Sequence, residues 1–149
     1  MREAIRLAEE SVREGGGPFG AVIARGGEIV ARGANRVVPG CDPTAHAEVT
    51  AIREAARRTG SFDLSGCEIY TSCEPCPMCL GAIYWARLDK VYYAASRKDA
   101  AAAGFADDFI YNELAMEPAR RRLPSEELLA GEGRRAFGLW AAKDDRTEY

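Results

Sequence analysis

Two short stretches of the chain decide its fold: Asp42-Pro43-Thr44-Ala45-His46-Ala47-Glu48 and Thr71-Ser72-Cys73-Glu74-Pro75-Cys76-Pro77-Met78-Cys79. The first contains His-x-Glu, and the second contains Pro-Cys-x-x-Cys. Imidazole and thiolate groups are ligands that suit zinc, and three protein ligands leave the fourth tetrahedral position open. The pattern therefore predicts a zinc site at His46, Cys76 and Cys79.

The cysteine pair on its own leaves other interpretations open. Cys76 and Cys79 lie three residues apart on a predicted helix, so both thiolates face one way. Such a pair also fits a redox centre or half of a structural zinc site. Cys73 adds an iron–sulfur alternative, but that motif needs a further cysteine at a position held by Ile83. His46, the only histidine of the chain, favours zinc.

The ligands fall where two helices are expected to begin. Asp42 is a candidate N-cap with proline after it, and prolines also open the helix of the cysteine pair. Unpaired N–H groups at a helix start favour thiolates and a metal-bound hydroxide. Zinc lowers the pKa of a bound water to about 7, and Glu48 is placed to take the proton. In the middle of a helix, the side chains of His46 and Glu48 would point in different directions. At the start of a helix, both side chains can reach the metal.

Periodicity and turn residues predict a mixed α/β order around these helices. A helix is expected over 2–14, and a hairpin of strands 19–24 and 28–32 turns at Gly26-Gly27. A loop over 33–41 leads to a helix that ends at Gly60. Strand 67–73, helix 75–86 and strand 90–95 then form a parallel crossover. Short helices are expected over 107–114 and 136–142, with a frayed polar end over 143–149.

Composition narrows the class of protein. A chain of 149 residues is about one domain, here expected to span 1–149. A net charge of −3 and a pI of about 5.3 make nucleic acid an unlikely partner. The longest uncharged run, Pro75–Ala86, is shorter than the roughly 20 residues of a membrane span. Five cysteines and a charged N-terminus without a signal-peptide apolar region predict a reducing, cytoplasmic location.

These motifs resemble the cytidine-deaminase-like superfamily of zinc enzymes. Two of them, Gly17–Val22 and Asp42–Glu48, also occur in tRNA-adenosine deaminases, so they do not select a substrate. The stretches Tyr84–Arg87 and Asp99–Tyr111 are similar to bacterial guanine deaminases, as is the terminal Glu148-Tyr149. Residues 117–142 match poorly.

The resemblance implies a three-layer α/β/α sandwich around a five-stranded mixed sheet, and hydrolysis of guanine to xanthine and ammonia. It implies one zinc per subunit on the predicted ligands, with Glu48 as the proton shuttle and Asp107 as a second catalytic group. It also implies a homodimer in which the C-terminal tail, residues 134–149, is swapped onto the partner. The purine would then be bound by Phe19, Asn35, Ala47, Trp85, Glu148 and Tyr149.

Several of these assignments have structural alternatives. Trp85 also fits a core residue, Asp107 an N-cap and Asn35 a turn residue. A tRNA-specific adenosine deaminase, or a deaminase of cytosine, guanosine or a triazine, would use the same metal chemistry. A non-catalytic zinc module is the remaining class, but a structural site normally has four protein ligands.

Overall fold

The computed structural model describes residues 1–105 and 107–149. The chain divides into two compact units, Met1–Phe109 and Ile110–Tyr149. A single domain over 1–149, with a tail that begins at residue 134, stays a prediction.

A mixed sheet with the order β2-β1-β3-β4 forms the centre of the first unit. Strand β1 pairs antiparallel with both β2 and β3, and β3 pairs parallel with β4, which confirms the predicted hairpin and crossover. Gly26 and Gly27 turn the hairpin with φ of 57° and 85°, values that glycine adopts without a steric penalty. The strands are β1 (Gly20–Arg25), β2 (Glu28–Ala34), β3 (Glu68–Cys73) and β4 (Lys90–Ala95).

The prediction of a fifth strand is wrong for the residues that the structure describes, because their sheet has four strands. After β4 the chain enters helix α5 (Arg97–Ala102). Ser96 and Asp99 form a capping box at its start, each side chain accepting a hydrogen bond from the other residue's backbone N–H. This local signal, followed by a run of alanines, favours a helix over a returning strand.

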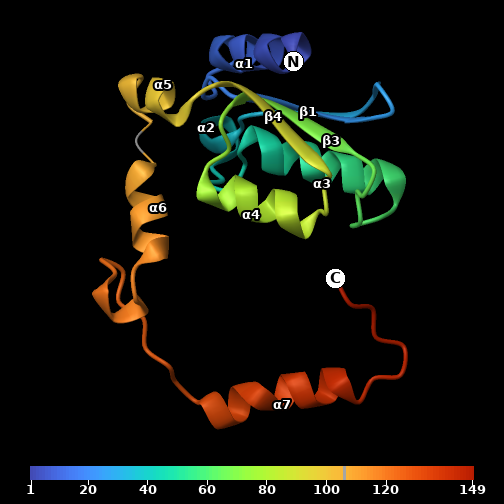
Figure 1. Cartoon of the computed structure of the whole chain (residues 1–149), viewed down its shortest axis with the longest axis vertical. Coiled ribbons are helices and arrows are strands. Elements are labelled where there is room, and N and C mark those ends of the chain that lie inside the picture. The colour runs from blue at the N-terminus through green and yellow to red at the C-terminus, as the bar shows by residue number, and fades with distance from the viewer. Residues whose placement is uncertain (106) are drawn as a thin grey trace. The chain divides into compact units, whose positions relative to one another are not determined.

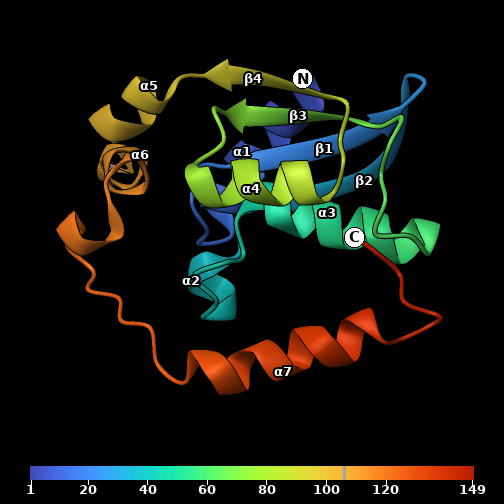
Figure 2. The same ribbon diagram turned by 60° about the horizontal axis from the view of Figure 1, so that its bottom comes forward.

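Helices cover both faces of the sheet (Figures 1 and 2). Helix α1 (Arg2–Arg13) lies on one face, where Val22 packs against Ala4 and Leu7. Helices α3 (Ala47–Thr59) and α4 (Pro77–Trp85) lie on the other, where Ile23 joins the larger buried cluster. Adjacent residues of β1 thus serve opposite faces, as strand geometry requires. Within this unit the three layers follow the predicted α/β/α order.

Some helix boundaries differ from the sequence-based expectation. Asp42 is not the N-cap of α3, because its Oδ1 accepts hydrogen bonds from the Thr44 N–H and hydroxyl in a turn before the helix. Helix α3 starts at Ala47 with His46 in the N-cap position, and α4 starts at Pro77 with Cys76 in that position. The region expected as a loop contains the end of β2 and the short helix α2 (Val37–Gly40).

The later part of the chain is helical with irregular connections. It contains α6 (Asp108–Ala115), the 3₁₀ turn η1 (Pro118–Arg120) and α7 (Ala130–Ala141), which is longer than predicted. Helix α7 has no buried residue and contains Gly131, Gly133 and Gly138. Across the described residues, none of the helices combines the length and apolarity needed to cross a membrane.

Close packing at Gly33 fixes the start of α3 against β2. A Cβ atom at Gly33 would collide with the carbonyl oxygen of Ala47 and lie 2.5 Å from the amide nitrogen of Ala51. Ala47, Ala51 and Ala55 are buried on this side of α3, so only small side chains separate helix from strand. The contact sets the position of the helix end that carries His46.

We expect Gly33→Ala to lower the free energy of unfolding by about 2–3 kcal/mol, because backbone atoms of α3 would have to move. Thermal or urea denaturation measures the change. Gly81→Ala is the matched control, since a Cβ there meets nothing within 4 Å and alanine favours the interior of a helix. A Gly33→Ala protein as stable as the parent would contradict the close contact.

Candidate zinc-dependent active site

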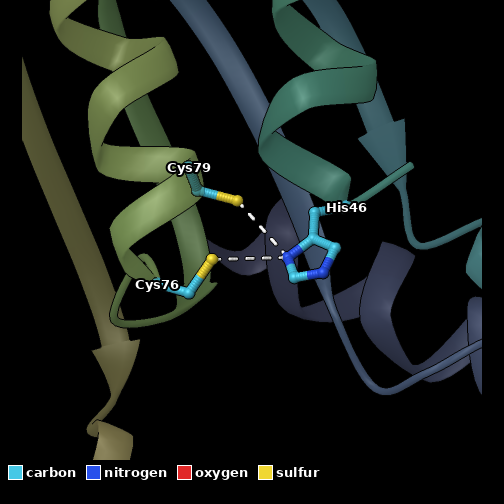
Figure 3. Close-up of side chains that lie close together, drawn as sticks. All are labelled: His46, Cys76 and Cys79. Carbon is cyan, nitrogen blue, oxygen red and sulfur yellow. Dashed lines mark hydrogen bonds between the residues drawn. The ribbon is translucent and has the colours of Figure 1, made fainter. Parts of the chain in front are cut away.

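The three predicted metal ligands meet where α3 and α4 begin (Figure 3). The Nδ1 atom of His46 lies 3.5 Å from Cys76 Sγ and 3.4 Å from Cys79 Sγ. All three ligand atoms lie within 4.8 Å of one another. The extended backbone of both N-cap residues, His46 and Cys76, directs the chain into its helix from the metal side.

These separations fit a zinc ion. With Zn–S of about 2.3 Å and Zn–N of about 2.0 Å, a tetrahedral ion separates nitrogen from sulfur by about 3.5 Å. The observed distances agree with that value, and the donor set of one imidazole and two thiolates suits zinc. His46, Cys76 and Cys79 therefore form a zinc site with three protein ligands, which is the ligand number of catalytic zinc.

The two thiols differ in their readiness to ionise. A hydrogen bond from Cys79, together with one to His46, lowers the pKa of Cys76 to about 4. The same sulfur–sulfur hydrogen bond, with burial, raises the pKa of Cys79. The bond to Cys76 also raises the pKa of His46, and the charges of Glu48 and Asp107 act in the same direction.

Glu48 lies buried in the first turn of α3, beside the ligands. Burial raises the pKa of its carboxyl group, and a hydrogen bond with Cys79 opposes that rise. A carboxyl group with a raised pKa gives up and takes protons closer to neutral pH. Glu48 thus has the place and the electrostatics of a proton carrier next to the metal.

Asn35 is held in one orientation. Its side-chain Oδ1 accepts hydrogen bonds from the backbone N–H groups of Gly17 (3.2 Å) and Val37 (3.3 Å). The backbone N–H of Asn35 donates to the carbonyl of Phe19. The side-chain oxygen is occupied by these donors, so the amide NH₂ group is the part of Asn35 available to a ligand. A buried asparagine fixed in this way is a directed hydrogen-bond donor.

Aromatic and acidic groups from α5 and the residues after it extend the site. The ring of Phe19 meets that of Phe105 edge to face, with centroids 5.0 Å apart. The charge of Asp107 contributes to the raised pKa values of His46 and Cys73, which places this carboxylate near the metal ligands. The sequence interpretation assigned no role to Phe105; the Ser96–Asp99 capping box was the available signal for the helix that positions it.

Trp85, Glu148 and Tyr149 are not brought to the metal within the first unit. Trp85 is the last residue of α4, at the end opposite Cys76, and its side chain is exposed. Ala47, by contrast, follows the zinc ligand His46 directly and is buried at the first position of α3. Glu148 and Tyr149 belong to the second unit, where Oε1 of Glu148 lies 3.8 Å from Nε of Arg146. The substrate roles of these residues stay predictions.

Comparison with known proteins identifies the family. A family profile described as the cytidine and deoxycytidylate deaminase zinc-binding region matches residues 1–95. The fold and the zinc ligands agree with that match, and the chain belongs to this deaminase family.

Individual relatives are consistent with this assignment. The chain is 51% identical to the guanine deaminase of Bacillus subtilis over 150 residues, covering 100% of this chain and 96% of the relative. The crystal structure of a B. subtilis guanine deaminase superposes with a TM-score of 0.96, covering 99% of this chain and 95% of that one. A tRNA-specific adenosine deaminase of Aquifex aeolicus is 43% identical over 98 residues, which is 66% of this chain and 65% of the relative.

We expect zinc binding at a pH above the raised pKa of His46 to release about one proton, because Cys79 must ionise whereas Cys76 is already a thiolate. Below the raised pKa of His46, a second proton is displaced, so zinc affinity falls as the pH drops through that pKa. Calorimetric titration of zinc-free protein in buffers of different ionisation enthalpy measures both effects. Cys41→Ser, at an exposed thiol elsewhere, is the control. Unchanged zinc affinity in Cys79→Ser would contradict the ligand set.

Proposed function

We propose that this protein hydrolyses guanine to xanthine and ammonia. The observation that carries the proposal is the full-length match to a guanine deaminase, whereas the tRNA-deaminase relative matches over 98 residues. The zinc site and buried Glu48 supply the machinery that such a hydrolysis needs.

The zinc ion and the protein side chains have different roles in the proposed reaction. When bound, zinc supplies an activated water as nucleophile at neutral pH. Glu48 takes one proton from the attacking water and gives it to the purine ring nitrogen. It then takes a second proton from the new hydroxyl group at C2 and gives it to the leaving amine. Asp107, whose charge contributes to the raised pKa of the zinc ligand His46, assists proton transfer at the 2-amino group. Water adds at C2 and ammonia leaves, so no redox partner is required.

The remaining residues orient the base. Asn35 donates from its NH₂ group to an acceptor of the purine, since Gly17 and Val37 already occupy its oxygen. The N–H of Ala47, at the first position of α3, offers a second donor. Phe19, braced edge to face by Phe105, provides an apolar wall for the ring.

The second unit supports a proposal about assembly. Large apolar side chains of this unit are exposed, and none of the residues of α7 is buried. Such a surface is characteristic of a segment that packs against another protein surface. We propose a homodimer in which residues 134–149 close the partner's site, with Glu148, Tyr149 and Trp85 contacting the purine there. The exposed apolar side chains of the second unit include Leu123, Leu128, Leu129, Phe137, Leu139 and Trp140.

Two further proposals concern the location of the protein and a second candidate substrate. None of the five cysteines forms a disulfide, which fits the predicted cytoplasmic location. A tRNA substrate is the second candidate, because tRNA-specific adenosine deaminases are among the relatives.

We expect the zinc-loaded protein to release ammonia from guanine in preference to cytosine and guanosine. Glu48→Gln should lower kcat by about a thousandfold while zinc content stays the same, since it removes the proton carrier without removing a ligand. Glu54→Gln, at a partly exposed carboxylate of the same helix that pairs with Arg57, is the matched control. Absence of ammonia from any free base, together with salt-sensitive tRNA binding, would favour the tRNA reaction instead.

A complementation experiment tests the swapped tail. We expect deletion of residues 144–149, which follow α7, to lower kcat/KM for guanine about tenfold or more. Co-expression of this truncated chain with full-length Glu48→Gln should recover activity above that of either variant, because the intact Glu48 site would receive the other chain's tail. If each tail closes its own site, the mixture will stay as inactive as the separate variants.

A further inference from the structure

Glu74 links the loop that carries the zinc ligand Cys76 to the start of α5. Its Oε2 accepts a hydrogen bond from the backbone N–H of Arg97 at 3.1 Å, and its Oε1 lies 3.8 Å from the Arg97 guanidinium. Its own N–H donates to the carbonyl of Ala95 at 2.9 Å. The carboxylate is partly buried, which strengthens a charged hydrogen bond relative to one in water.

The other end of α5 reaches the proposed substrate pocket. The N–H of Phe105 donates to the carbonyl of Ala100 at 2.9 Å, so the backbone of Phe105 is bound to α5 itself. The Phe105 ring braces Phe19, and Asp107 follows shortly along the chain. Helix α5 therefore connects the contact at Glu74 with Phe105, which follows its last turn.

The contact is separate from the helix cap. Asp99 satisfies the N–H and hydroxyl of Ser96, and Ser96 accepts from the N–H of Asp99. Glu74 adds the hydrogen bond to Arg97 from outside the helix. The capping box accounts for the start of α5, and the Glu74 side chain adds a contact between that start and the loop before Cys76.

We infer that Glu74 is a positioning residue for substrate binding, which holds α5 so that Phe105 and Asp107 are aligned with the zinc ligands. The inference rests on the proposed guanine reaction. Glu74 is not a zinc ligand and does not exchange protons with the substrate in this role. Its loss changes how well the purine is held, while the metal remains bound.

The test compares Glu74→Ala, Glu74→Gln and Asp99→Ala. We expect Glu74→Ala to lower kcat/KM for guanine about tenfold to a hundredfold, with one zinc per chain retained, because small displacements of positioning groups are costly. Glu74→Gln should recover part of the loss, since its amide oxygen still accepts from Arg97. Asp99→Ala, which weakens only the helix cap, should change kcat/KM by less than threefold.

Two further measurements separate this role from others. In the inactive Glu48→Gln background, adding Glu74→Ala should weaken guanine binding about tenfold in a fluorescence titration. In protein labelled with 4-fluorophenylalanine, the ¹⁹F signal lost in Phe105→Leu identifies Phe105. That signal should shift in Glu74→Ala and stay in place in Asp99→Ala, with no substrate present.

Opposite results overturn the inference. Loss of zinc in Glu74→Ala would make Glu74 a support of the ligand loop, and equal losses in Asp99→Ala would reduce it to a contributor to helix stability. Wild-type kinetics and an unmoved Phe105 signal would show no role. An inactive wild-type protein would reject the guanine reaction, while the Phe105 signal would still decide whether Glu74 positions α5.

Discussion

Two helix ends have to meet around one metal ion, and the rest of the first unit makes that meeting possible. His46 occupies the N-cap position of α3 and Cys76 that of α4. These helices lie on the same face of the sheet; α4 follows β3 directly, whereas the short helix α2 lies between β2 and α3. The bare backbone at Gly33 lets α3 approach β2 closely enough to fix its start. The ligand geometry is thus a consequence of close backbone packing on the sheet.

The meeting of the two helix starts also influences which groups near the metal site are charged. The first N–H groups of a helix carry partial positive charge, which favours the thiolate of Cys76 and accommodates anions formed at the metal. Burial acts on Glu48 in the other direction and raises the pKa of its carboxyl group. A thiolate that ionises readily and a carboxyl group that ionises reluctantly therefore lie side by side. The first is a zinc ligand, and the second is the residue proposed to carry the proton.

The sequence was sufficient wherever the signal was local. Gly26-Gly27 predicted the hairpin, and the strand–helix–strand spacing predicted the parallel pair β3–β4. The spacing of His46, Cys76 and Cys79 predicted the zinc site, because their residue types define the chemistry before any contact is known. The resemblance to guanine deaminases extended that chemistry to a substrate, and the full-length relative agrees with it.

Features that depend on contacts between distant residues could not be predicted in this way. The turn at Asp42 moved the start of α3 to Ala47, because a carboxylate can bond to the turn before a helix as well as to the helix itself. The pairing of Phe19 with Phe105 joins segments far apart in the chain. The number of strands came from the family resemblance, and the local cap at Ser96 directed the described chain into α5.

The orientation of His46 has a consequence for how the protein can be observed. Its Nδ1 atom faces both sulfurs, so in the zinc-bound protein the ring proton must reside on Nε2 (Figure 3). That tautomer leaves a fixed N–H donor on the far edge of the imidazole. Since the chain has a single histidine, its ring nitrogens give one pair of resonances. Magnetic resonance of this one side chain therefore reports the tautomer, and with it metal occupancy, without any assignment of the spectrum.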